Sequence, residues 1–224
     1  MENKKILIIS PHLDDEAICS GGLIMRAKKE KAKVFVLYMA NGKTRQFMSR
    51  SGQAPVDKRE LEAEKASMYG KFEYKITFQG DEIMRLDSLP QKDLIEAIEN
   101  ITKEFQSDIV VIPYRDSFSQ DHRAVAQACI TAFRPLPKSL HWQPEMILEM
   151  EEPYSWTQSF TPNFYVDISD VFEEKIELYK CHASQVPEDP FPRSINNLRR
   201  LAGMRGCDIS VKYAEGYRLL KGQL

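Results

Sequence analysis

The sequence predicts a single-domain α/β protein with a mostly parallel sheet flanked by helices. Its first half alternates short apolar runs with longer amphipathic segments, the pattern of parallel strands joined by crossover helices. The chain has 224 residues, of which 42% are hydrophobic and 29% charged, as in an ordinary globular domain. No repeat or convincing linker divides it, so the predicted domain spans residues 1–224.

Local sequence patterns indicate each element of the first half. Isoleucine- and valine-rich runs are typical of buried parallel strands. Leu94, Ile98 and Ile101 recur at helical spacing. Small residues at 20–22 allow the first helix to lie close to the sheet. The polar segment 42–56 predicts a long loop, a type that is often functional. The predicted elements are, in order, strand 6–10, helix 15–29, strand 34–39, helix 57–69, strand 74–78, helix 90–105, strand 109–112 and helix 123–133.

The second half is less regular, because prolines interrupt it at 135, 137, 144, 187, 190 and 192. Between these breaks the apolar patterns still predict strands and helices. The elements expected there are strands 146–150 and 164–168, helices 171–181 and 195–204, and a final strand 217–220.

Charge and hydropathy narrow the classes of partner. A formal net charge of −2 argues against nucleic acid or an anionic membrane as the main partner. No apolar stretch approaches the about 20 residues that cross a bilayer. Residues 1–5 run directly into the first strand, which leaves no room for a signal peptide and predicts a cytoplasmic protein. The four cysteines form no Cys-x-x-Cys pair and are interpreted as small buried residues. The oligomeric state stays open, a homo-oligomer included.

The first chemical motif is the segment Ser10-Pro11-His12-Leu13-Asp14-Asp15-Glu16, directly after the apolar run 6–9. The loop after the first strand of an open α/β sheet is a common place for ligands. Three adjacent carboxylates repel one another unless a cation or hydrogen bonds compensate them. Imidazole and carboxylate together suit zinc. Two other interpretations stay open for this segment alone: a capped helix start, and the magnesium-binding acidic pair of receiver-type signalling domains.

A second motif, Gln120-Asp121-His122-Arg123, follows the strand 109–112. If the two strands are parallel neighbours, His12, Asp15 and His122 converge at one sheet edge. Two histidines and one carboxylate leave a coordination position open for water, which is the pattern of catalytic zinc sites. Receiver domains are about half this length and have no place for the second motif.

Together the two motifs resemble the LmbE-like family of N-deacetylases, the group named for the PIG-L enzyme. That family carries a His-Pro-Asp-Asp-Glu type motif and a His-x-Asp-His motif, here with Leu13 for the proline and Ser119 for the leading histidine. The resemblance extends along most of the chain. Its further residues are Arg59, Glu62 and Ala66, the segment 164–169, Lys175, the segment 182–185, Leu198 to Ala202, Arg205, Gly206 and the segment 213–215.

The resemblance implies a Rossmann-like fold and one zinc ion, or another divalent metal, bound by His12, Asp15 and His122. It implies hydrolysis of an N-acetyl group, with metal-bound water as the nucleophile and Asp14 as the general base. Asp121 is expected to orient a histidine. Glu16 is expected to be structural.

Ser119 departs from the family pattern, because a serine hydroxyl donates one hydrogen bond but carries no charge near pH 7. Serine is then a weaker donor, or another histidine replaces the missing one, with His182 preferred over His141. A third alternative is a metal- or ligand-binding family member with little or no catalysis.

The resemblance also implies the substrate class, an N-acetylated amino sugar or amino-sugar conjugate. A variant of this expectation is that the enzyme hydrolyses a longer N-acyl group in place of N-acetyl. Side chains near the strand ends are expected to bind the substrate: Arg45, Arg59, Asp81, Tyr114 and Arg115.

Overall fold

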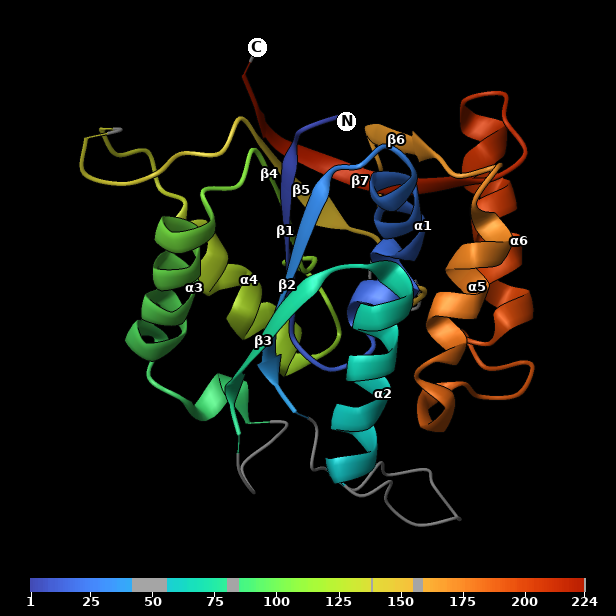
Figure 1. Ribbon diagram of the computed structural model, residues 1–224, viewed down its shortest axis with the longest axis horizontal. Helices are drawn as coiled ribbons and strands as arrows, with labels where there is room; N and C mark the ends of the chain where they lie inside the picture. The colour runs from blue at the N-terminus through green and yellow to red at the C-terminus, as the bar shows by residue number, and fades with distance from the viewer. Residues whose placement is uncertain (42–55, 80–84, 138, 155–158, 224) are drawn as a thin grey trace.

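The apolar runs form one central sheet in the computed structural model, which describes residues 1–41, 56–79, 85–137, 139–154 and 159–223. Seven strands in these residues hydrogen-bond in the order β3-β2-β1-β4-β5-β7-β6 (Figure 1). Their bounds are β1 Lys5–Ser10, β2 Lys33–Ala40, β3 Glu73–Phe78, β4 Ile109–Ile112, β5 Met146–Met150, β6 Phe164–Asp167 and β7 Ala214–Gly222. The helices are α1 Asp15–Lys29, α2 Val56–Gly70, α3 Gln91–Phe105, α4 Gln120–Ala132, α5 Phe172–Lys180 and α6 Ile195–Asp208.

The sheet is mostly parallel, as the sequence predicts. Strand β1 pairs in parallel with β2 on one side and β4 on the other, and β2–β3 and β4–β5 are also parallel. The exception is β7, which lies antiparallel between β5 and β6. Because β1 and β4 are direct neighbours, the two segments that follow them leave the same edge of the sheet.

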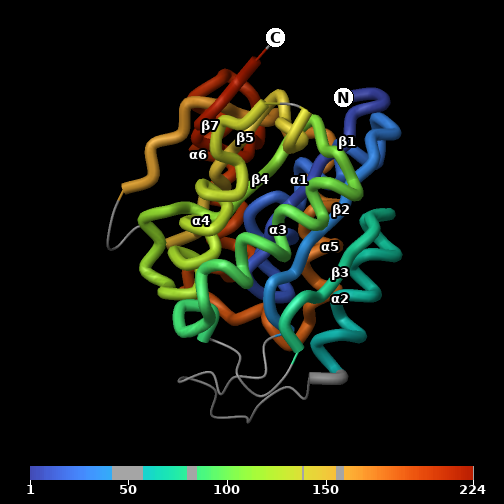
Figure 2. Tube along the Cα trace, turned by 90° about the vertical axis from the view of Figure 1, so that its left-hand side faces the viewer, coloured from blue at the N-terminus to red at the C-terminus, as the bar shows by residue number. Residues whose placement is uncertain are grey.

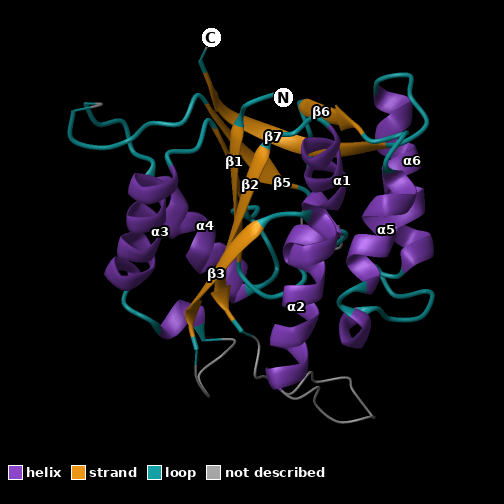
Figure 3. Cartoon of the chain, viewed as in Figure 1, coloured by secondary structure: helices purple, strands orange, loops and turns teal. Residues whose placement is uncertain are grey.

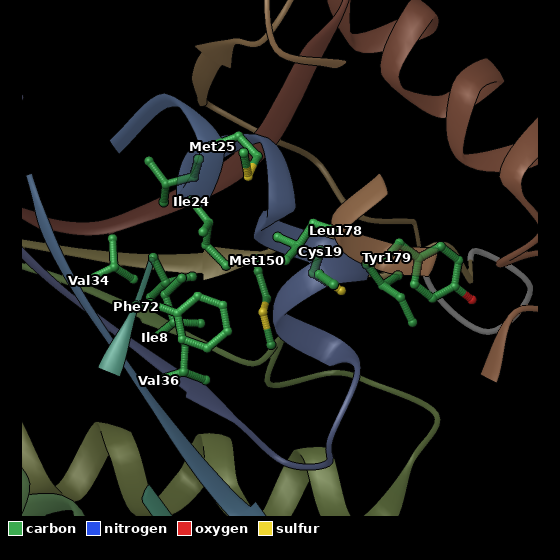
Figure 4. Close-up of a cluster of buried hydrophobic side chains, with 14 of the residues drawn as sticks. Ile8, Cys19, Ile24, Met25, Val34, Val36, Phe72, Met150, Leu178 and Tyr179 are labelled. Atoms are coloured by element: carbon green, nitrogen blue, oxygen red, sulfur yellow. The ribbon is translucent and has the colours of Figure 1, made fainter. Parts of the chain in front are cut away.

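Alternating side chains of the strands build a hydrophobic core on each face. Ile6 and Ile8 of β1 belong to the core with α1, α2, α5 and α6, part of which Figure 4 shows. Leu7 and Ile9 belong to the opposite core, with α3 and α4. The helix layers on the two sides of the sheet are seen in Figure 3, and Figure 2 views the molecule from the α3–α4 side. Both cores reach the strands that carry the two motifs.

Helix α1 is interrupted at Ser20, whose φ of −136° and ψ of 16° are not helical. The backbone N–H groups of Gly22 and Leu23 donate instead to the carboxylate of Glu215 in β7, at 2.7 and 2.8 Å. A Cβ on Gly22 would lie 2.5 Å from Cγ2 of Ile168, so only glycine allows this approach. The small residues therefore do bring α1 against the sheet.

The element bounds differ from the predicted ones mainly in three elements. Helix α4 begins at Gln120 rather than 123, so Asp121 and His122 occupy its first turn. Helix α6 continues to Asp208, and β7 extends in both directions beyond the predicted 217–220. The predicted loop 42–56 falls almost wholly outside the described residues.

Among the described helices, none is both long and apolar enough to cross a bilayer. Cys19 and Cys129 are buried free thiols, as expected, whereas Cys181 is half-buried and Cys207 is exposed, so the expectation is wrong for Cys207.

Candidate metal centre

The structure brings His12, Asp15 and His122 together where β1 and β4 end. His12 lies in the turn after β1, Asp15 is the first residue of α1, and His122 lies in the first turn of α4. One side-chain ligand atom from each of the three lies within 4.8 Å of the others. The predicted convergence of two motifs about a hundred residues apart is thus present in the fold.

The three donor atoms are Nδ1 of His12, Oδ2 of Asp15 and Nε2 of His122. Oδ2 of Asp15 lies 3.5 Å from the first imidazole nitrogen and 3.3 Å from the second. The backbone N–H of His12 donates to the same oxygen at 2.9 Å, which fixes the carboxylate within the turn. Two imidazole nitrogens and a carboxylate oxygen are the ligand set of several catalytic zinc sites.

The second nitrogen of each imidazole faces a carboxylate. Nε2 of His12 lies 2.9 Å from Oδ2 of Asp121, and Nδ1 of His122 lies 2.7 Å from Oε1 of Glu152. Both carboxylates are themselves held: Asp121 accepts from the backbone N–H of Leu86, and Glu152 accepts from the hydroxyl of Ser117. Histidines that bind metals commonly have such a partner, which sets the ring orientation and raises the basicity of the ligating nitrogen. The arrangement therefore fits a metal ion.

Electrostatics at this cluster favour a positive charge. Burial alone would lower the pKa of His122, but Asp15 and Glu152 raise it well above its usual value. Burial also favours the neutral form of His12, but its contacts with Asp121 and Asp15 outweigh this effect. The pKa of His12 is therefore raised. The pKa of Asp15 is held well below its usual range by the two histidines, against the effect of burial. The same carboxylates that retain protons on the imidazoles would stabilise a cation bound between them.

Asp14, the expected general base, lies next to this cluster between two arginines. Arg193 donates through NH1 to Oδ2 of Asp14 at 3.0 Å, and NH2 of Arg59 lies 3.6 Å from Oδ1. Arg59 also donates to the carbonyl oxygen of Leu13 at 3.0 Å. Arg59 is therefore a buried residue that contacts the motif loop, and its binding of substrate stays a prediction.

The remaining predicted residues lie in different surroundings. Ser119 is the N-cap residue of α4 and makes no side-chain capping bond. His182 is fully buried, with Nε2 2.7 Å from Oε1 of Glu16, and its catalytic role stays a prediction. The ring of Tyr114 packs edge-on against Phe160, with the ring centroids 4.9 Å apart.

Arg115 is turned toward the end of β5, where it donates to Glu149 at 2.7 Å. Arg45 and Asp81 lie outside the described residues.

Sequence reasoning missed Glu152 and Arg193. Glu152 follows β5 in a run of acidic residues, and no motif distinguishes it from its neighbours. Its one signal is that β5 ends beside β4 at the same sheet edge. Arg193 lies in the proline-rich segment before α6, which carries no indication of contact with Asp14.

Fold and site together define an α/β protein with a candidate mononuclear metal centre at the carboxyl ends of its parallel strands. A family model described as PIG-L, GlcNAc-PI de-N-acetylase, matches residues 7–133, more than half of the chain and both motifs. The chain belongs to this family.

Individual relatives match over nearly the whole chain. The diacetylchitobiose deacetylase of Thermococcus kodakarensis is 27% identical over 230 residues, which cover 98% of this chain and 84% of the relative. The N,N'-diacetylchitobiose deacetylase structure from Pyrococcus horikoshii has a TM-score of 0.77 at 24% identity, over 98% of this chain and 84% of that one. The structure of GalB, the 4-carboxy-2-hydroxymuconate hydratase of Pseudomonas putida KT2440, has a TM-score of 0.79 at 19% identity. The match covers 99% of this chain and 98% of that one. Structures at these identities share the fold, which carries more than one reaction.

Proposed function

We propose that the chain is a zinc-dependent hydrolase that removes an N-acetyl group from an amino sugar or an amino-sugar conjugate. The observation that carries the proposal is the His12–Asp15–His122 cluster, in which both imidazoles are backed by carboxylates. Family membership and the deacetylase relative support the reaction class. In this proposal residues 1–224 act as one deacetylase domain in the cytoplasm.

The three residues of the cluster would hold one zinc ion, or another divalent metal. Such an ion supplies a Lewis acid that polarises an amide carbonyl and lowers the pKa of water. Asp14 takes a proton from the attacking water and delivers it to the amine nitrogen as the C–N bond breaks. Arg193 holds the carboxylate of Asp14 in place throughout, and Asp121 and Glu152 keep the imidazoles oriented.

In this proposal the hydroxyl of Ser119 donates to the negatively charged oxygen that develops on the amide carbonyl, more weakly than a histidine would. Ser119 lies at the start of α4, three residues before His122, and its hydroxyl donates one neutral hydrogen bond. The same residue favours a second candidate function, a metal- or ligand-binding protein with little catalysis. Release of acetate from N-acetylglucosaminides by metal-loaded protein separates the two: a steady rate above that of the buffer excludes the binding-only function.

The substrate contacts proposed at the sheet edge are Tyr114 and Arg115, together with Arg45 and Asp81 of the segments not described. For His182 we propose a positioning role rather than contact with the substrate. Its ring nitrogen lies within hydrogen-bond distance of Glu16, the residue that follows Asp15 in α1.

Metal stoichiometry tests the site itself. After chelation and reloading, we expect about one zinc ion per chain in the wild type, and a loss of tight binding in both Asp15→Ala and His122→Ala. His141→Ala is the matched control, because this half-buried histidine is outside the cluster. Metal counts come from elemental analysis of dialysed protein. Full occupancy in either cluster variant would refute the shared site.

Zinc affinity should rise with pH. The raised pKa values of His122 and His12 mean that a metal ion must displace protons from these imidazoles at pH values below them. Asp15, whose pKa is lowered, is already ionised and contributes no slope. We expect the affinity to fall about tenfold per displaced proton for each unit by which pH drops below the raised values. Competition with a chromophoric chelator from pH 6 to 9 measures this, and a flat profile would contradict it.

A further inference from the structure

A cavity of about 350 Å³ lies beside the candidate centre, between the segment after β5 and helix α6. Its volume is at the lower end of the range for small-molecule sites, roughly 300–1,000 Å³. Six residues that line it matter here: Glu152, Tyr154, Phe160, Pro192, Leu201 and Met204.

The cavity shares two parts of its wall with the surroundings of the centre. Glu152 lines it and also bonds Nδ1 of His122, on the side of the ring away from Asp15. Pro192 lines it and directly precedes Arg193, which bonds Asp14. His12, Asp14 and Asp15 do not line it. The cavity is therefore lined by residues that contact the centre or adjoin such a residue, and not by His12, Asp14 or Asp15 themselves.

Charged groups in the wall are already paired. Arg205 and Glu151 form a two-pronged ion pair, with Nε–Oε2 and NH2–Oε1 distances of 2.8 and 2.5 Å. The side-chain amide of Asn197 donates to the carbonyl oxygens of Pro190 and Phe191. A charged ligand would have to compete with these bonds, whereas an uncharged apolar one leaves them intact.

Two aromatic rings, those of Tyr154 and Phe160, belong to the wall, and each packs against a further ring. Tyr154 packs edge-on against Phe118 at 4.7 Å between centroids, and Phe160 packs against Tyr114 at 4.9 Å. Burial raises the pKa of Tyr154 to about 12, so its phenol stays neutral at physiological pH. Met204 also lines the cavity and is about half exposed.

We propose that this cavity binds an uncharged, ring-sized apolar aglycone attached to the amino sugar. The proposal rests on the proposed deacetylase function. An amide that reacts at the His12–Asp15–His122 cluster places its acyl group at the cluster. The group that fills a cavity behind Glu152 is then separated from the amide by the sugar, as an aglycone is.

Kinetics with matched glycosides test the assignment. We compare phenyl and methyl 2-acetamido-2-deoxyglucosides, both anomers of each, and expect a KM lower by about tenfold or more for the better phenyl glycoside at similar kcat. Met204→Gln and Leu201→Asn should reduce this preference to within about twofold. Met68→Gln, the same change at an exposed methionine of α2 outside the cavity, should leave it unchanged. Equal KM values for phenyl and methyl glycosides in the wild type would overturn the proposal.

A binding measurement separates this proposal from the deacetylase function. Protein carrying ¹³C-methyl methionine is titrated with phenyl 2-amino-2-deoxyglucoside, the expected product, and Met204 should shift while Met68 does not. A Met204 shift without turnover of any glycoside supports the cavity and refutes the deacetylase function. Turnover without a preference for the phenyl glycoside and without a Met204 shift supports the deacetylase function and refutes the aglycone cavity. Preference for an N-butanoyl over an N-acetyl group, abolished by Met204→Gln, would make this an acyl pocket and overturn the aglycone assignment.

Discussion

Asp14→Asn should lower the rate of acetate release by about 10²–10⁴-fold while zinc content and thermal stability stay close to those of the wild type. Proton transfer by a positioned side chain contributes roughly this factor, and the upper end applies when one residue serves as both base and acid. Asparagine keeps the shape of the side chain and an oxygen acceptor for NH1 of Arg193, but it takes up no proton.

The choice of asparagine over alanine matters, because alanine would leave the mostly buried guanidinium of Arg193 without its carboxylate partner. Asp93→Asn, an exposed carboxylate in the first turn of α3, is the control for the chemical change. Acetate is measured enzymatically in protein whose zinc content has been determined. Activity within about threefold of the wild type would remove Asp14 from the mechanism and leave the metal centre untouched.

Lys175→Met should lower the free energy of unfolding by about 3–5 kcal/mol, the usual cost of removing one partner from a buried ion pair. Nζ of Lys175 lies 2.7 Å from Oε1 of Glu215, and both side chains are at most 5% exposed. Glu215 also accepts from Gly22, Leu23 and the hydroxyl of Tyr217. Without the ammonium group, the carboxylate that bridges the break in α1 stays buried with only neutral donors.

The same helix contains a matched control. Lys180 lies 2.7 Å from Glu177, but these side chains are 49% and 55% exposed. Lys180→Met should therefore change the free energy of unfolding by no more than about 0.5 kcal/mol. Urea denaturation measures both. The double variant Lys175→Met, Glu215→Gln should lose less than the sum of the two single changes; strict additivity would mean that the two groups are not coupled.

The sequence predicts the parallel half of the fold and the convergence of the motifs, because both depend on local patterns. Apolar runs identify β1 and β4, and the residues that follow a strand must lie at its carboxyl end. The order of neighbouring strands then places His12 and His122 together. What local patterns do not contain is the position of β7, which inserts between β5 and β6.

Partners brought in from the irregular half could not be predicted for the same reason. Glu152 and Arg193 reach the site from segments without periodicity, and only the packed chain shows which carboxylate or guanidinium meets which motif residue. Several residues that carry the family resemblance outside the motifs turn out to be structural contacts. Glu62 accepts from the backbone and hydroxyl of Ser184.

The position of β7 also has a consequence for how the chain is made. A ribosome releases residues 164–167 before 214–222, yet among the strands of the described residues β6 pairs only with β7. Until β7 is released, β6 lacks a partner and the outer edge of β5 is open, and open strand edges are templates for pairing with other chains. Release of β7 therefore closes two open strand edges at once, and a nascent chain that ends before residue 214 is exposed to misassembly at both.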